Sequence, residues 1–129
     1  TFVVNEPVYR VRIDSQLAPG SLTYGELVVP GRESGEVVIS THTCHPSLCN
    51  DNLSGIATTA LLARDVARSP SRFGFRFVFV PATLGPLVWL SRNEALASRT
   101  VGGLVVAGVG DPGPFTYIRA GNPEQQTLA

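Results

Sequence analysis

The chain has 129 residues, enough for one domain with a buried core and too few for two independent domains. Hydrophobic residues make up 43% and charged residues 16%, which is typical of a globular protein that is low in charge. The formal net charge is zero, so nothing in the composition favours nucleic acid or an anionic membrane as a partner. Apolar runs stay well below the roughly 18 residues of a membrane-spanning helix, and no signal-peptide pattern is present, so we expect a cytoplasmic protein.

The two cysteines, Cys44 and Cys49, lie in one predicted loop. A disulfide between them would close a very small ring and stabilise little. We therefore expect free thiols, most simply as buried side chains. The chain begins with Thr1 and contains no methionine, which favours a piece of a longer polypeptide.

The first part of the chain has the pattern of a small β unit. Residues 8–14 alternate between apolar and charged side chains, which predicts a half-exposed antiparallel strand. Residues 22–29 form a second extended segment between two Pro-Gly turn signals. Residues 1–31 are therefore predicted to contain strands without an intervening helix.

The remainder alternates between strand and helix patterns. Short apolar runs predict buried strands, and apolar residues at helical spacing predict helices. In chain order the predicted elements are a strand at 37–40, a helix at about 53–67, a strand at 73–80, a helix at about 85–97 and a strand at 103–107. This order favours an α/β fold with a mostly parallel sheet and right-handed crossovers.

The densest group of reactive side chains lies in residues 40–55, STHTCHPSLCNDNLSG. This segment follows a predicted buried strand, and ligand sites of open α/β sheets form at the carboxyl ends of strands. Imidazole, thiol and carboxylate groups are also the usual ligands of transition metals. Asp51, Asn52 and Ser54 offer oxygens that could cap the following helix.

Simpler roles remain open for each candidate. His42 is either a metal ligand or a buried hydrogen-bonding histidine, and Asp51 could cap a helix as well as bind metal. His45 is either a further ligand or a residue that orients His42. The spacing of the cysteines matches no closed zinc module, and the serines of the loop do not lie in a Gly-x-Ser-x-Gly elbow, so a Ser/His/Asp triad is weakly supported.

Several motifs together resemble one protein family. Beside the histidine loop, the chain carries a segment at 13–31 that starts IDS and contains YGE and PG, LSRN at 90–93 and GDPGPF at 110–115. These residues resemble the zinc aminopeptidases of the bacterial leucyl aminopeptidase and glutamate carboxypeptidase type. Within that clan the chain is most similar to an uncharacterised bacterial branch with an inserted β domain. The resemblance covers roughly residues 8–118.

The resemblance implies a fold and a division of the chain. We expect part of a three-layer αβα phosphorylase/aminopeptidase-like sheet, preceded by a small β segment. Residues 1–35 would be the end of an inserted β domain, residues 36–118 the first half of the aminopeptidase-like α/β domain, and residues 119–129 a polar tail. Members of this family are several times longer than this chain.

The resemblance also implies site residues. His42 matches the first zinc ligand, and Cys44 stands where the clan has the aspartate that orients it. Asp51 matches the bridging carboxylate, and Asn52 follows it at a peptide bond that is often cis in the clan. His45 has no counterpart in the wider clan but belongs to the loop of this branch, so it is a further candidate ligand.

The decisive departure from the pattern of the clan lies at the position of its general base. The clan carries its general-base glutamate at the end of the strand after the first helix, and this chain has Ala82 there, which can neither accept a proton nor bind metal. The next carboxylate ligand falls on Ala107, and the last histidine ligand would lie beyond residue 129. We therefore expect a zinc-dependent aminopeptidase-like hydrolase of impaired activity, with a peptide or small amide as substrate and a homo-oligomer as an open option. The alternative is a non-catalytic protein that keeps the fold for binding or assembly.

Overall fold

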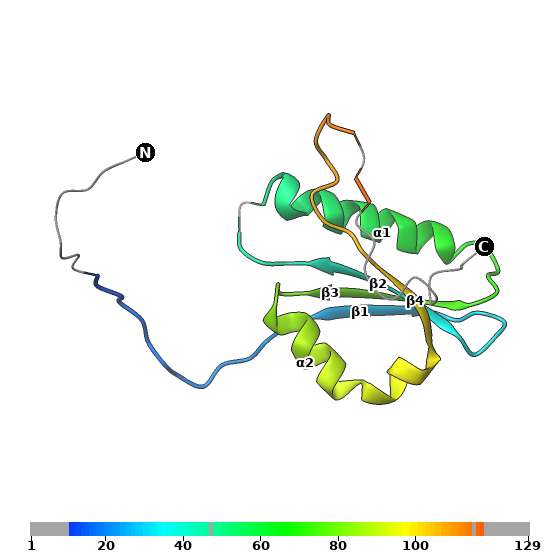
Figure 1. Cartoon of the computed structure of the whole chain (residues 1–129), viewed down its shortest axis with the longest axis horizontal. Helices are drawn as coiled ribbons and strands as arrows, with labels where there is room; N and C mark the ends of the chain where they lie inside the picture. The colour runs from blue at the N-terminus through cyan, green and yellow to red at the C-terminus, as the bar shows by residue number, and fades with distance from the viewer. Residues whose placement is uncertain (1–10, 47, 115, 118–129) are drawn as a thin grey trace.

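The computed structural model describes residues 11–46, 48–114 and 116–117 (Figure 1). Four strands form one sheet in the order β1-β3-β2-β4: β1 (Gly25–Val29), β2 (Glu36–His42), β3 (Gly74–Val80) and β4 (Thr100–Val105). β2 pairs in parallel with both β3 and β4, and β1 pairs antiparallel with β3. The prediction of an α/β fold with a mostly parallel sheet is confirmed.

Helices cover the two faces of the sheet. Figure 1 shows α1 (Gly55–Val66) on one side and α2 (Leu84–Arg92) on the other, with a 3₁₀ helix, η2 (Glu94–Arg99), leading from α2 to β4. β3 and β4 lie on opposite sides of β2, so two crossovers of the same hand must place their helices on opposite faces. The result is the three-layer αβα arrangement predicted from the sequence.

Alternate residues of β3 pack into two separate hydrophobic cores, one on each face of the sheet. Phe77 is fully buried and packs with Ile39, Ala63 and Val106 on the α1 face. Its neighbour Val78 faces the other way, and the second core contains Val78, Val80 and Trp89 of α2. Because successive side chains of a strand point to opposite faces, β3 contributes apolar side chains to the cores on both faces of the sheet.

β4 differs from the sequence prediction in position and in burial. The predicted buried strand at 103–107 is observed at Thr100–Val105, and most of its residues are exposed. Val101, Leu104 and Val105 have exposed fractions of 38%, 40% and 73%. The reason is that β4 forms the margin of the sheet in the described part of the chain, so β2 shields it from one side alone.

The strand predicted at residues 8–14 is not observed where the structure describes it. Residues 11–14 form no strand, and Val11 and Ile13 are about four-fifths exposed because no second strand lies against them among the described residues. Residues 8–10 lie outside the described residues, as does the polar tail at 119–129. Only Gly25–Val29 of the predicted extended segment 22–29 is a strand, and it joins the main sheet through β3. The domain division at residue 35 stays a prediction.

The predicted helices are present with altered ends. The helix predicted at 85–97 is divided at Asn93, whose Nδ2 donates to the Trp89 carbonyl at 2.8 Å and closes the last turn of α2. The helix predicted from residue 53 begins at Gly55, after an irregular segment at Asn50–Ser54. In the described part of the chain, no helix has the length and hydropathy needed to cross a membrane.

An ion-pair network joins four elements on the α2 face. Arg76 of β3 donates from Nε to Glu36 Oε2 of β2 at 2.8 Å and also pairs with Glu26 of β1. Arg99 of η2 donates to Glu36 Oε1 at 2.9 Å. The Glu36 side chain is only 7% exposed. The hydrogen bond from Arg76, helped by the charges of Arg76 and Arg99, lowers the pKa of Glu36 although burial opposes this shift.

Acid is expected to destabilise the fold through Glu36. Its pKa in the folded chain lies below the ordinary 4.5, so its contribution is fully present above that value and is lost as the pH falls through the lower folded value. Urea unfolding between about pH 7 and about pH 3 should show a steeper loss of unfolding free energy for the wild type than for Glu36→Gln. Glu33→Gln, which removes an exposed pair with Arg72, is the matched control and should behave like the wild type. Equal slopes for wild type and Glu36→Gln would contradict this role.

Candidate functional site

A histidine and an aspartate meet at the carboxyl end of β2. His42 is the last residue of the strand, and its Nε2 lies 2.7 Å from Asp51 Oδ1. The His42 side chain is 23% exposed and that of Asp51 is 74% exposed, so the pair borders solvent. β3 and β4 flank β2 on either side, and α1 and α2 leave on opposite faces, so the pair lies at the topological switch point where open α/β sheets bind ligands.

Asn52 holds the strand ends beside this pair. Its side chain is fully buried, and its Nδ2 donates to Thr41 Oγ1 at 2.8 Å and to the His42 carbonyl at 3.0 Å. The Thr41 hydroxyl donates in turn to the Val106 carbonyl at 2.9 Å. The peptide bond between Asp51 and Asn52 is cis, as the resemblance implied. Asn52 therefore connects the end of β2 with the residue that follows β4.

The oxygens expected to cap α1 are used differently. α1 has no side-chain cap hydrogen bond. Asn52 Oδ1 and Ser54 Oγ instead accept the backbone N–H groups of Gly108 and Val109, both at 3.1 Å. The capping prediction was wrong because the loop after β4 lies close enough to compete for these oxygens, which sequence spacing does not show.

Three of the reactive side chains of the histidine loop are exposed. Cys44 and Cys49 are free and exposed, so the expectation of buried thiols was wrong. His45 is also exposed, and its Nδ1 lies 2.9 Å from the carbonyl of Pro46. The roles predicted for His45 as a ligand and for Cys44 as an orienting residue stay predictions.

Ala82, predicted to occupy the general-base position, follows β3 at the edge of the sheet where β2 ends. β2 and β3 pair through His42 and Val80, and the Thr43 N–H donates to the Val80 carbonyl at 2.8 Å. Ala82 therefore follows β3 at the same edge of the sheet as His42. Thr83 has φ +61°, and the Leu84 N–H reaches the Ala82 carbonyl at 2.7 Å, which forms a tight turn that L-residues adopt at a cost.

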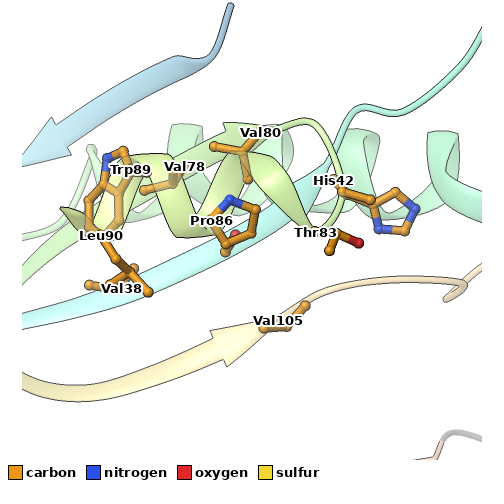
Figure 2. A pocket seen from close by; sticks show the side chains of 11 residues that line it. Val38, His42, Val78, Val80, Thr83, Pro86, Trp89, Leu90 and Val105 are labelled. Carbon is orange, nitrogen blue, oxygen red and sulfur yellow. The ribbon is translucent and has the colours of Figure 1, made fainter. Parts of the chain in front are cut away.

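An apolar cavity of about 330 Å³ opens beside His42. Figure 2 shows His42 at one end and Trp89 and Leu90 of α2 at the other, with Val105 of β4 along one side. Sequence reasoning missed this cavity, since its walls come from both flanking strands and from α2. Its lining residues are Val38, Ser40, His42, Val78, Val80, Ala82, Thr83, Pro86, Trp89, Leu90 and Val105.

The pair offers two donors of the kind that zinc prefers. Zinc binds histidine nitrogen and carboxylate oxygen at about 2.0–2.1 Å in tetrahedral geometry, so two ligand atoms lie roughly 3.3 Å apart. The 2.7 Å contact of His42 with Asp51 is shorter, and an ion would replace this hydrogen bond after a side-chain shift of about 0.6 Å. No cluster of three or more His, Cys, Asp or Glu side chains occurs among the described residues. The donors thus fit zinc in chemistry and supply half of a tetrahedral shell.

Known proteins are similar to this chain in sequence and in fold. A family model described as a domain of unknown function (DUF4910) matches residues 5–127. The chain belongs to this family. A relative from Clostridium acetobutylicum, named "Putative polysaccharide biosynthesis protein with aminopeptidase-like domain", is 46% identical over 111 residues. The match includes 86% of this chain and 26% of the relative, so this member of the DUF4910 family spans about a quarter of that protein.

Two solved structures support the same fold. The crystal structure of a "putative peptidase" from Clostridium acetobutylicum has a TM-score of 0.69 and 43% sequence identity, over 70% of this chain and 21% of that one. A glutaminyl cyclase from an Acidobacteriales bacterium has a TM-score of 0.50 and 22% identity, over 70% of this chain and 39% of that one, and shares the fold alone. The resemblance to an aminopeptidase-like protein is confirmed at the level of fold.

Replacing Thr83 by glycine is expected to stabilise the chain. Glycine adopts positive φ without the clash that a β-branched side chain meets, so the unfolding free energy should rise by about 1 kcal/mol. Urea unfolding of Thr83→Gly against Thr83→Ala measures this, because alanine removes the side chain but keeps the clash of Cβ. A lower stability for the glycine variant than for the alanine variant would show that the turn costs nothing.

Proposed function

We propose that this chain forms the first part of a zinc-dependent aminopeptidase-like hydrolase domain that acts on peptide or amide bonds. The observation that carries the proposal is the contact of His42 with Asp51 at the switch point of the sheet. The aminopeptidase-like and peptidase names of the two Clostridium proteins support it. The chain spans only a quarter or less of those proteins, so further ligands would come from polypeptide beyond it.

In this proposal each residue of the site has a separate task. His42 and Asp51 contribute two ligands to zinc, and Asn52 holds the backbone of His42 through its carbonyl. When bound, zinc acts as a Lewis acid towards a carbonyl oxygen. The cavity beside His42 receives the apolar part of a substrate, since most of its walls are aliphatic or aromatic.

The proposal includes impaired catalysis in this chain. A general base accepts a proton from the attacking water and typically contributes about 10²- to 10⁴-fold in rate. Ala82 occupies the position of that base and has no group that accepts a proton. The described residues next to Ala82 at the end of β3 are Val80, Pro81 and Thr83, none of which acts as a base near neutral pH.

The same observation favours a second candidate function. A protein that keeps the sheet, the cavity and the His42–Asp51 pair but lacks the base could bind a peptide or amide without cleaving it. Such a protein would serve in binding or assembly, alone or as a homo-oligomer. The two candidates differ in one property, which is whether restoring the base restores hydrolysis.

Zinc binding is expected to depend on both members of the pair. In the longer polypeptide that carries this chain and its remaining ligands, the wild type should bind about one zinc ion, and His42→Ala and Asp51→Ala should each lose most of it, because each variant removes one ligand. Native mass spectrometry after dialysis against zinc measures the occupancy. Asp65→Ala is the control, since its carboxylate pairs with Arg64 on α1. His45→Ala tests whether that residue is a further ligand. Full zinc occupancy in both His42→Ala and Asp51→Ala would exclude the pair as a zinc site.

Ala82→Glu is expected to increase hydrolysis. In the longer polypeptide that carries this chain and its remaining ligands, the new carboxylate should raise the turnover of an aminoacyl-arylamide panel by about 100-fold or more. Ala82→Gln is the matched control, because it adds similar volume without a base. Equal turnover in the two variants would favour the non-catalytic candidate.

A further inference from the structure

Three consecutive backbone N–H groups after β4 bind the segment that carries Asp51. Each of them donates to a different side-chain oxygen of Asn50–Ser54, and we call these three bonds the loop ladder. Its members are Gly108 N to Asn52 Oδ1 at 3.1 Å, Val109 N to Ser54 Oγ at 3.1 Å, and Gly110 N to Asn50 Oδ1 at 2.7 Å.

The acceptors of the loop ladder are themselves held in place. Ser54 Oγ donates to the Asn50 carbonyl at 2.6 Å and lies 3.0 Å from Asn50 Oδ1. Asn50 Nδ2 points to Asp111 Oδ2 at 3.4 Å. The side chains of Asn50 and Ser54 therefore form one connected unit with the loop.

The two segments approach too closely for a side chain at two positions. A Cβ added at Gly55 would lie 2.3 Å from Asn52 Oδ1 and 2.6 Å from the Val106 carbonyl. A Cβ added at Gly110 would lie 2.8 Å from Ser54 Cβ. The contact is thus closed by backbone and short side chains, which leaves little freedom to either segment.

Asp51 lies between two residues of the loop ladder. Its own side chain is 74% exposed, so burial does not fix the direction of its carboxylate. The side chains on either side, Asn50 and Asn52, are both bound to the loop after β4. The backbone of Asp51 is therefore held at both ends, and its Oδ1 lies 2.7 Å from His42 Nε2.

We propose that Asn50 and Ser54 are positioning residues, which hold the Asp51 carboxylate against His42 by binding the loop after β4. Asn50 acts from the amino-terminal side of Asp51, and Ser54 supports Asn50 from the residue just before α1. A movement of residues 108–110 would reorient the Asp51 carboxylate, even in a protein in which neither His42 nor Asp51 is substituted. The zinc measurement below rests on the proposed function, while the spectroscopic one does not.

The test compares Asn50→Ala and Ser54→Ala with the control Asn93→Ala, whose amide binds the Trp89 carbonyl in α2. In ¹⁵N-histidine-labelled chain, both site variants should shift the His42 ring-nitrogen signals, and the control should leave them unchanged. Zinc added as the chloride should bind about 10-fold more weakly to the site variants. Unfolding in urea separates these effects from a general loss of stability.

A charge-exchanging variant keeps the test decisive if the alanine variants do not fold. Asn50→Asp alone keeps an acceptor for the Gly110 N–H but places its carboxylate against that of Asp111, so it should shift the His42 signals. Asn50→Asp combined with Asp111→Asn exchanges donor and acceptor and should restore the wild-type signals. Wild-type ring signals in Asn50→Asp would overturn the positioning role of Asn50, and wild-type signals in a folded Ser54→Ala would overturn that of Ser54. Absence of zinc binding by the longer polypeptide that carries this chain and its remaining ligands would reject the proposed function, and the ring signals would still decide the positioning role.

Discussion

The amide of Asn52 is the interaction on which the rest of the site depends. It is removed from water, so its donors and its acceptor require partners inside the protein. It finds them at Thr41 and His42 on β2 and at Val106 and Gly108 beyond β4, more than 50 residues further along the chain. One side chain thereby fixes the ends of β2 and β4. Because Asn52 follows Asp51 and binds the His42 carbonyl, it also fixes the backbone that carries the His42–Asp51 pair.

The site divides into a polar and an apolar half that share His42. Towards α1, the segment after the histidine loop and the loop after β4 bind each other through short polar side chains and backbone. Towards α2, the cavity wall consists mainly of aliphatic groups and Trp89. This division follows from the sheet itself, because successive residues at its carboxyl edge face opposite layers. A substitution in the cavity wall on the α2 face therefore leaves the polar contacts on the α1 face in place.

Sequence reasoning succeeded where the relevant information was local. The alternation in Gly74–Val80 and the helical spacing after Gly55 predicted the elements, and their order predicted the parallel pairing. It failed where a partner decides the outcome: residues 11–14 alternate but have no strand to pair with among the described residues. The loop ladder could not be predicted either, since no sequence pattern indicates that residues 108–110 lie against Asn50–Ser54. The cavity likewise depends on tertiary packing.

β4 forms a margin of the sheet in the part of the chain that the structure describes. β4 contains neither a charged residue nor a proline, and its valine and leucine side chains are exposed on both faces. Proteins usually protect such strands with charges or irregularities, because an open edge is a template for another strand. β4 carries one such irregularity, because its pairing with β2 shifts register between Thr100 and Gly102. Beyond this shift, its backbone leaves a place for a further strand at this margin in the described part of the chain.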